Sequence, residues 1–389
     1  MMTVGIVGAG AMGSGIAQVA LRNGHQVVLA DVEKSATLKA RESIDAALAR
    51  DVEKGRLTSE TATSARDRLR TASLPAGLGE FSECGLVVEA IVEGLDAKQS
   101  LFRALEGVVS PDCVLATNTS SLSVTSIASA CQAPGRVVGM HFFNPAPVMP
   151  LVEIIPGAQT SSEVTGATRA IADGWGKVTV LAADSPGFIV NRVARPFYGE
   201  SLRILEDGVA DAPTIDWALR ELAGFRMGPF LLMDFIGNDV NYAVTESVWR
   251  ATYFDGRYRP SITQKRLVEA GWLGRKSGRG FYEYGPDAPA RPATEDRALG
   301  EGIVLRVLAM LVNEAVDVVR WRIATPADVD LAMKKGVNYP RGPLAWGNEL
   351  GLEGVLKEIV RLRGESGEDR YRPSPLLRRM VKEGRRFFE

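Results

Sequence analysis

The sequence is poor in the residues that most often bind metal ions or form disulfides. Its 389 residues include two histidines and three cysteines. The cysteines, Cys84, Cys113 and Cys131, form no CxxC pair, which argues against a disulfide framework and against a thiolate zinc site. We therefore expect three reduced thiols and no metal ion.

Net charge and long hydrophobic runs are also scarce. The formal net charge is −1, from 46 basic and 47 acidic residues, so the composition does not favour binding to nucleic acid or to an anionic membrane. No apolar run is long enough to cross a bilayer, and the N-terminus lacks the basic region of a signal peptide. These absences predict a cytoplasmic globular protein, and the length predicts two or three domains.

Short β-rich runs alternate with helical patterns in the first half of the chain. This alternation predicts an α/β, Rossmann-like domain over residues 1–184, with a parallel sheet that carries helices on both faces. A polar stretch at 33–70, with Gly55 near its middle, predicts an inserted helical hairpin. A helix is expected at 11–23. Strands are expected at 3–7, 26–29, 86–89, 114–117, 137–140 and 178–181.

Helical patterns dominate after residue 185, and they repeat. At a constant offset of 114 residues, the identities include Arg192 with Arg306, Glu200 with Glu314, Asp216 with Asp330, and Gly228-Pro229 with Gly342-Pro343. The repeat predicts two tandem all-α domains, 185–285 and 296–389, joined by a linker near 285–293. We expect the second copy to be truncated and structural, because it lacks the sequence GRGFYEY of residues 278–284.

A glycine-rich loop follows the first predicted strand and opens the first helix. In the GxGxxG pattern, Gly8 permits a tight turn, Gly10 allows a pyrophosphate to approach the backbone, and Gly13 lets the helix pack closely on the strand. Ala11 and Met12 lie at the helix N-terminus, where free N–H groups face a phosphate. Asp31 ends the second strand, where a carboxylate binds the ribose hydroxyls of NAD and repels the 2′-phosphate of NADP.

One of the two histidines is a candidate acid/base. His25 falls in a turn, which favours a surface role, whereas His141 ends an apolar strand at the edge where ligands bind in such sheets. Glu153 lies in the apolar run LVEII, where a carboxylate is costly without a partner. If two adjacent strands bring Glu153 to His141, the pair can take a proton from an alcohol. The alternative is a buried glutamate bound to backbone or water.

Two further polar sites have a structural and a functional interpretation. Asn118 and Ser120 follow an apolar strand, where Ser120 can cap a helix or contact a ligand. Asn191 lies in an apolar helical start, and its counterpart in the second copy is Leu305. Because the fold does not need an amide at that position, we favour a ligand-binding role for Asn191.

Taken together, these residues resemble the 3-hydroxyacyl-CoA dehydrogenase family over nearly the whole chain. The blocks that carry the resemblance are GIVGAGAMGSGIAQVA, VVEAIVEGLDAKQSLF, ATNTSSLSVTSIA, GMHFFNPAPVMPLVEII, DSPGFIVNR and GPFLLMDFIGND. The resemblance implies NAD as cofactor, a CoA thioester as substrate, and oxidation of (S)-3-hydroxyacyl-CoA to 3-oxoacyl-CoA. It also implies that the second helical copy replaces a partner subunit, as an internal pseudo-dimer in a monomeric chain, although a homodimer stays open.

The same resemblance implies roles for individual residues. His141 is expected to be the general base and Glu153 its partner. Ser120 and Asn191 are expected to position the substrate's oxygen atoms. The expected cofactor contacts are Gly8, Gly10, Ala11, Met12, Gly13, Asp31, Glu93, Lys98 and Asn118, and the expected CoA contacts are Ser43 and Arg50 on the inserted hairpin.

Three other functions stay open at this point. A dehydrogenase of a free hydroxy acid, similar to gulonate dehydrogenase, shares the histidine and the glutamate. A non-enzymatic NAD-binding protein is less consistent with His141, Glu153, Ser120 and Asn191 occurring together. A lysine-based hydroxy-acid dehydrogenase finds no support, because the polar residues centre on His141.

Overall fold

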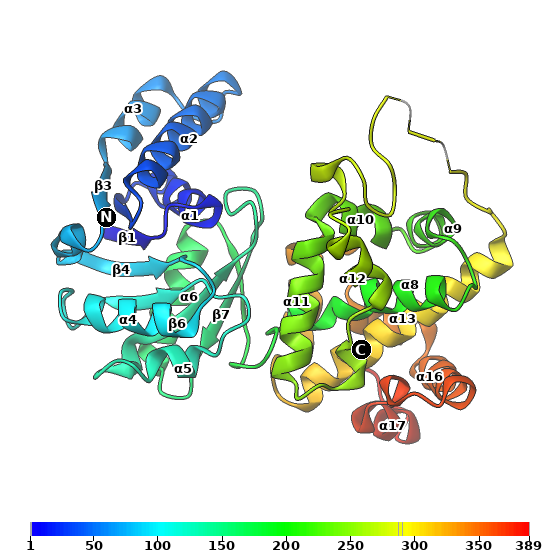
Figure 1. Cartoon of the computed structure of the whole chain (residues 1–389). Coiled ribbons are helices and arrows are strands. Elements are labelled where there is room, and N and C mark those ends of the chain that lie inside the picture. The colour runs from blue at the N-terminus through cyan, green and yellow to red at the C-terminus, as the bar shows by residue number, and fades with distance from the viewer. Residues whose placement is uncertain (1, 287, 290, 389) are drawn as a thin grey trace. The chain divides into compact units, whose positions relative to one another are not determined.

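The computed structural model describes residues 2–286, 288–289 and 291–388. The chain divides after Phe188 into two compact units. The first unit is a sheet with helices on both faces, and the second is helical (Figure 1). The predicted linker near 285–293 includes residues 287 and 290, which lie outside the described residues.

The first unit contains one eight-stranded sheet among the described residues, in the order β3-β2-β1-β4-β5-β6-β7-β8. The central strands are near-continuous apolar runs, because both of their faces are covered. The strands are β1 (Thr3–Val7), β2 (Gln26–Asp31), β3 (Leu69–Ser73), β4 (Cys84–Glu89), β5 (Val114–Thr117), β6 (Val137–Phe142), β7 (Leu151–Pro156) and β8 (Val178–Leu181).

The sheet departs from the predicted all-parallel arrangement at one edge. Strand β7 runs antiparallel to β6, and β8 runs parallel to β7. The connection from Phe142 to Leu151 is short, whereas a parallel crossover needs about a dozen residues or more, so the chain can only turn back. Strand β3 was not predicted either, because its residues LRTAS are mostly polar and it lies at the opposite edge of the sheet.

Helices cover both faces of this sheet. One face packs against α1, α2, α3 and α6, and the other packs against α4, α5 and the short η1. Gly55, with φ 65°, lies between α2 and α3, the two helices of the polar stretch. The helices are α1 (Ala11–Arg22), α2 (Lys34–Glu53), α3 (Ser59–Asp67), η1 (Ala76–Phe81), α4 (Leu95–Glu106), α5 (Val124–Ala128), η2 (Pro134–Arg136) and α6 (Ser162–Gly174).

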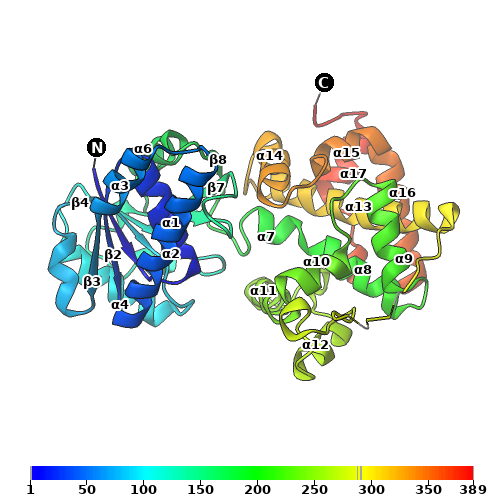
Figure 2. The ribbon, with the colours of Figure 1, turned by 90° about the horizontal axis from the view of Figure 1, so that it is seen from above.

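The second unit is built around the long helix α13, which packs against α8, α15 and α16 (Figure 2). Its helices up to the linker are α7 (Val190–Val193), α8 (Arg195–Glu206), α9 (Ala212–Trp217), η3 (Ala218–Leu222), α10 (Pro229–Ile236), α11 (Asn238–Ala251), η4 (Gly256–Tyr258), α12 (Ile262–Glu269) and η5 (Arg275–Ser277). Those after the linker are α13 (Arg297–Arg320), α14 (Pro326–Gly336), α15 (Pro343–Leu350), α16 (Leu352–Ser366), η6 (Asp369–Tyr371) and α17 (Pro375–Lys382).

Charged side chains are buried in the centre of the helical unit. Glu314 on α13 is fully buried and binds Arg192 Nε at 2.8 Å and Arg257 Nη1 at 3.0 Å. Glu200 on α8 is also buried and binds Arg306 Nε at 2.5 Å. Buried carboxylates of this kind are tolerated because each faces a cation.

No helix in the described part of the chain is long and apolar enough to span a membrane.

Candidate active site

The glycine-rich loop has the geometry of a nucleotide-binding turn. Gly8 has φ 104°, a conformation that side-chain-bearing residues rarely adopt. A Cβ on Gly13 would lie 1.7 Å from the carbonyl oxygen of Gly8, so only glycine permits this packing of α1 on the loop. A Cβ on Gly10 would meet no protein atom within 4 Å. Gly10 also caps α1 without a side-chain hydrogen bond, which leaves the helix N–H groups for an anion.

Asp31 ties the end of β2 to this loop. Its Oδ2 accepts a hydrogen bond from Ala9 N at 2.7 Å, and its Oδ1 accepts one from Glu33 N at 3.0 Å. Asp31, Gly8 and Gly10 line one cavity of about 460 Å³. Apolar residues that were not predicted as site residues complete this cavity, and they are Val7, Val32, Leu74, Ala90, Ile91, Val92, Ala97 and Leu101.

Two of these apolar residues, Val32 and Val92, follow the ends of β2 and β4 in the sequence. Val32 and Val92 are 71% and 76% exposed, which is unusual for valines that follow buried strands. An apolar cavity of this size can accept a planar ring such as a purine.

A buried ion pair between Lys98 and Glu89 lies next to the loop that follows β4. Lys98 Nζ lies 2.6 Å from Glu89 Oε1 and 3.2 Å from Glu93 Oε2, and Lys98 is 1% exposed. Glu89 also accepts from Thr117 Oγ1 at 2.6 Å and from Ile91 N at 2.7 Å. Glu89 was not predicted as a site residue, although a carboxylate at the end of an apolar strand is a usable sequence signal. Lys98 therefore orders the loop that carries Glu93.

Glu93 joins the ends of β4 and β5. Its Oε1 accepts hydrogen bonds from Thr119 Oγ1 at 2.6 Å, Ser120 N at 2.9 Å and Ser121 N at 3.0 Å. Burial raises the pKa of Glu93, but the Lys98 ammonium and these hydrogen bonds outweigh it, and the pKa falls to about 2. Glu93 is therefore an anion that fixes the turn in which Ser120 lies.

His141 and Glu153 form the pair that the sequence analysis anticipated. They are direct cross-strand partners in the antiparallel β6–β7 ladder, so their side chains share one face of the sheet. His141 Nδ1 lies 2.7 Å from Glu153 Oε2, with His141 5% exposed and Glu153 fully buried. The rings of Phe143 and Phe188 lie 4.6 and 5.7 Å from the imidazole and confine it.

Asn118 supports the strand that carries His141. Its Oδ1 accepts a hydrogen bond from Phe142 N at 2.8 Å, and its own backbone N–H donates to Glu89 O at 2.8 Å. The amide oxygen of Asn118 therefore already accepts a hydrogen bond from the protein backbone. Its NH₂ group is the part that can contact a cofactor.

The other predicted residues fall at different places. Ser43 lines a cavity of about 400 Å³ together with Gly10, Lys39 and Asn144, and the sequence analysis had missed Lys39. Arg50 lies on α2 and is exposed, but it is not among the residues that line this cavity. Asn191 lies on α7 in the helical unit, where its carbonyl oxygen accepts from Arg195 Nε at 2.8 Å.

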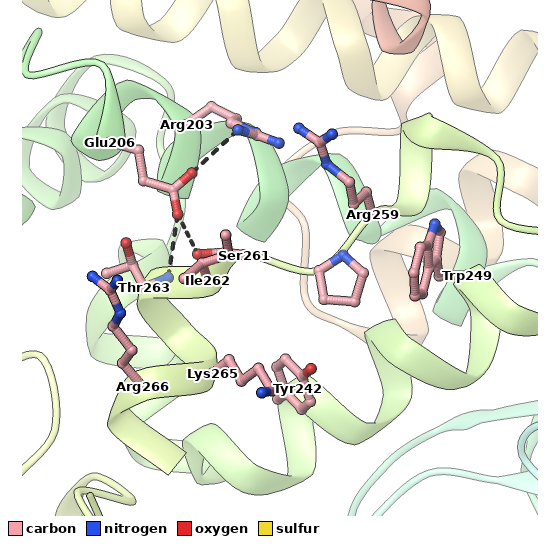
Figure 3. A pocket seen from close by; sticks show the side chains of 11 residues that line it. Arg203, Glu206, Tyr242, Trp249, Arg259, Ser261, Ile262, Thr263, Lys265 and Arg266 are labelled. Carbon is pink, nitrogen blue, oxygen red and sulfur yellow. Dashed lines mark hydrogen bonds and ion pairs between the residues drawn. The ribbon is translucent and has the colours of Figure 1, made fainter. Parts of the chain in front are cut away.

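The helical unit has a cavity of its own, of about 600 Å³, among α8, α11 and α12 (Figure 3). Glu206 lies within it, accepts from Ser261 Oγ at 2.6 Å and lies 3.4 Å from Arg203. None of the predicted site residues lines this cavity. Within residues 2–286, 288–289 and 291–388, no group of three His, Cys, Asp or Glu side chains is placed to hold a metal ion.

The chain is similar to known proteins over nearly all of its length. The sequence matches "3-hydroxyacyl-CoA dehydrogenase, NAD binding domain" over residues 3–185. It matches "3-hydroxyacyl-CoA dehydrogenase, C-terminal domain" over residues 187–284 and 303–386. The chain is 37% identical to the 3-hydroxyadipyl-CoA dehydrogenase of Escherichia coli K12, over 97% of each protein. It is 42% identical to a probable 3-hydroxybutyryl-CoA dehydrogenase of Bacillus subtilis, over 72% of this chain and 96% of that protein.

A solved structure extends the likeness to three dimensions. The crystal structure of 3-hydroxybutyryl-CoA dehydrogenase from E. coli K12 has a TM-score of 0.92 and 36% identity, over 98% of each chain. The first unit is an NAD-binding domain, and the residues of its loop, Asp31 and the adjoining cavity fit that cofactor. The chain is an NAD-dependent enzyme, and it belongs to the 3-hydroxyacyl-CoA dehydrogenase family.

Proposed function

We propose that this enzyme oxidises (S)-3-hydroxyacyl-CoA to 3-oxoacyl-CoA, or catalyses the reverse reduction, with His141 as the acid/base. The observation that carries the proposal is the 2.7 Å hydrogen bond between His141 Nδ1 and Glu153 Oε2. Because the carboxylate accepts the Nδ1 proton, the lone pair of the neutral ring lies on Nε2. Nε2 is therefore the atom that takes the proton of the substrate hydroxyl.

His141 and Glu153 have different roles in the proposed reaction. His141 removes the hydroxyl proton while the C3–H bond breaks and the C–O bond becomes a carbonyl. Bound NAD supplies the acceptor for the hydride that leaves C3. Glu153, fully buried beside the ring, stabilises the imidazolium that forms. In the reverse direction the same imidazolium returns its proton to the new alkoxide.

Cofactor binding is proposed for the loop and its neighbours. Gly10, Ala11 and Met12 present the N-terminus of α1 to the pyrophosphate, because that end has no side-chain cap. Asp31 binds the adenosine ribose. Gly8 and Gly13 shape the turn, and Glu93, Lys98 and Asn118 line the nicotinamide side.

Substrate binding is proposed for residues of both units. Ser120, held by Glu93, and Asn191, on α7, position the thioester and the C3 oxygen. Ser43 and Arg50 on α2 contact CoA, and the cavity lined by Ser43 and Lys39 supports the placement of Ser43. The predicted cytoplasmic location belongs to the same proposal, and cell fractionation tests it.

We also infer that the helical unit contains two copies of one domain, 185–285 and 296–389, arranged as an internal pseudo-dimer. Asp216 accepts from the backbone N–H groups of residues 230 and 231 at 2.9 and 3.0 Å. Asp330, 114 residues later, accepts from those of residues 344 and 345 at 2.8 and 2.9 Å. The acceptor carboxylate and the donor N–H groups are all shifted by the same 114 residues, which supports the same local fold in both copies.

The second copy was expected to lack the segment at 278–284, and a shorter stretch at its end makes a similar contact. In the first copy, Phe281 N donates to Asp234 Oδ1 at 2.9 Å. Asn348 takes the same place 114 residues later, and its Oδ1 accepts from Phe387 N at 3.1 Å. The glycines that precede the two phenylalanines, Gly278 and Gly384, both have positive φ. We infer that residues 384–388 (GRRFF) are a shortened counterpart, which the fixed offset of 114 had hidden.

Steady-state assays test the proposed reaction. NADH consumption is followed with acetoacetyl-CoA and, in parallel, with free acetoacetate. Turnover of the thioester alone supports the proposal. Turnover of the free acid alone assigns the chain to the gulonate dehydrogenase-like alternative, and NADH binding without turnover of either compound favours a binding protein. Deletion of 296–389 tests the pseudo-dimer, because a stable, monomeric and fully active remainder contradicts it.

A further inference from the structure

The cavity among α8, α11 and α12 combines positive charge with aromatic rings (Figure 3). Its volume of about 600 Å³ falls within the usual range of small-molecule sites, roughly 300 to 1,000 Å³. Four of the residues that line it are basic and one is acidic, and none of them is assigned to the proposed reaction. The basic residues are Arg203, Arg259, Lys265 and Arg266, and the acidic residue is Glu206.

Like charges gather around Arg203. Figure 3 shows the guanidinium groups of Arg203 and Arg259 pointing towards each other. Burial and the neighbouring charge of Arg370 lower the pKa of Arg203, and the charge of Arg259 acts in the same direction. Glu206 compensates only in part, because its Oε2 lies 3.4 Å from Arg203 while its Oε1 accepts a hydrogen bond from Ser261 Oγ at 2.6 Å.

A single further carboxylate, Glu368, is shared among three arginines. Its Oε2 lies 2.7 Å from Arg370 Nε and 3.5 Å from Arg259 Nη2. Burial raises the pKa of Glu368, but the charges of Arg370, Arg203 and Arg259 outweigh it, and the pKa falls. Arg370 is only 4% exposed, and its Nη2 is buried without a hydrogen-bond partner in the part of the chain that the structure describes. Positive charge therefore exceeds negative charge in this cluster.

The repeat shows which anion the cluster lacks. Arg370 corresponds to Arg257 at an offset of 113, and Arg203 corresponds to Asp317 at an offset of 114. Arg257 Nη1 lies 2.6 Å from Asp317 Oδ2, so these two residues form a buried ion pair. At the corresponding place an arginine stands where the acid would be. The counterion that Asp317 provides within the fold is therefore open to a bound ligand beside Arg203.

Aromatic side chains line the same cavity. Tyr242 and Trp249 lie seven residues apart on α11, so they share one face of that helix. Pro260 and Ile262 add apolar surface, and Ile262 is 66% exposed. Planar rings such as nucleobases stack on aromatic side chains, and arginines bind phosphate groups through paired N–H donors. The cavity offers both kinds of contact.

We propose that this cavity binds a phosphate ester of nucleotide size, with the phosphate on Arg203 and Arg259 and the planar ring against Trp249 and Tyr242. The phosphate supplies the counterion that the arginine cluster lacks. A phosphate monoester carries a charge of about −1.5 to −2 near neutral pH, more than a carboxylate does, which suits a cluster of several arginines. The site belongs to the helical unit alone, so the inference does not depend on the proposed reaction.

Isothermal titration calorimetry with AMP tests the site. The full-length enzyme is first saturated with NADH, so that the nucleotide loop of the first unit is occupied, and the buffer contains no phosphate. AMP is expected to bind to the wild-type protein, whereas adenosine and inorganic phosphate are each expected to bind about 10-fold more weakly or worse, because each lacks one half of the ligand. Absence of AMP binding, or equal binding of adenosine, overturns the inference. Equal binding of inorganic phosphate overturns the role of the aromatic residues.

Two arginine variants locate the binding. Arg259→Met is expected to weaken AMP binding by about 10-fold or more, and the half-exposed position of Arg259 favours a folded variant. Arg250→Met is the matched control, because Arg250 is exposed on α11, pairs with Glu246 at 3.1 Å and does not line the cavity. AMP affinity is expected to stay unchanged in this control. Equal affinities in the two variants would place the bound AMP elsewhere and contradict the inference.

A charge reversal tests the argument from the repeat. Arg203→Asp introduces the acid that the second copy has at position 317, so it is expected to supply Arg370 with an internal counterion. In phosphate-free buffer the Tm of this variant should be higher than that of the wild type. AMP should raise the Tm of the wild type and leave that of Arg203→Asp unchanged. A variant that is less stable than the wild type, or that AMP still stabilises, contradicts the missing-counterion argument.

Discussion

The guanidinium Nε of Arg192 lies 2.8 Å from Oε1 of Glu314, a residue 122 positions later in the chain. The residues at an offset of 114 from these two form the reciprocal pair, in which Arg306 Nε lies 2.5 Å from Glu200 Oε1. Each repeat thus contributes an arginine to the other repeat's glutamate. The exchange ties the two repeats together through buried charges rather than through apolar contacts alone.

Glu314→Gln is expected to lower the free energy of unfolding by about 3 kcal/mol or more, because it removes the buried anion that faces Arg192 and one of the two that face Arg257. Urea denaturation followed by circular dichroism measures the change. Glu365→Gln removes the exposed pair with Arg361 and serves as the control, with an expected change below about 0.5 kcal/mol. Equal effects of the two substitutions would contradict a special role for the buried pair.

His141→Gln is expected to reduce kcat by about 10²- to 10⁴-fold, because it removes the group that transfers the proton. NADH affinity, measured by fluorescence titration, is expected to stay near the wild-type value. Glu153→Gln provides the companion variant, with a smaller loss, since the ring remains but the anion that stabilises the imidazolium is gone. A near-normal rate in His141→Gln would refute the assigned role.

Substitutions of two glycines in the glycine-rich loop are expected to affect different properties, namely NADH binding for Gly10 and stability for Gly13. Gly10→Ala should give a folded protein, because the new methyl group meets no protein atom within 4 Å, yet it should bind NADH weakly, since the methyl occupies the pyrophosphate position. Gly13→Ala should instead destabilise the first unit, because its methyl group would lie 1.7 Å from Gly8 O. Thermal unfolding and NADH titration of both variants separate the two effects. Intact NADH binding in Gly10→Ala is the result that would exclude Gly10 from the cofactor site.

Glu93 predicts a pH dependence of stability. Its pKa is about 2 in the folded protein and 4.5 in an ordinary setting, so its contribution to stability is fully present above pH 4.5. That contribution is lost as the pH falls from about 4.5 towards 2. The stability difference between wild type and Glu93→Gln should therefore be largest at neutral pH and shrink on acidification. A difference that stays constant from pH 7 to pH 4 and below would argue that Glu93 acts without its charge.

Local patterns in the sequence predicted the elements that build the nucleotide loop. Strand β1 was predicted within its observed bounds, and α1 and β2 were predicted to within two residues of theirs, because buried strands and amphipathic helices have different periods. Glu153 was singled out because a carboxylate in an apolar run needs a partner, and the antiparallel register makes it the direct neighbour of His141. These predictions succeed because the residues that determine each element lie close together in the sequence.

Other features depend on distant contacts. Strand β3 has the composition of a loop, and it is ordered because β2 offers it a parallel partner. Glu89 ends an apolar strand in the sequence, but its pairing with Lys98 is identified only when β4 and α4 are brought together. The apolar cavity beside Asp31 is lined by residues from Val7 to Leu101, which no short stretch of sequence contains.

The reciprocal arginine–glutamate pairs have a consequence for behaviour on dilution. An interface between separate subunits dissociates when the protein concentration falls below its dissociation constant. Here both halves belong to one polypeptide, so the effective concentration of each half around the other is set by chain length rather than by expression level. Specific activity is therefore expected to stay constant over dilutions at which a two-subunit arrangement would come apart.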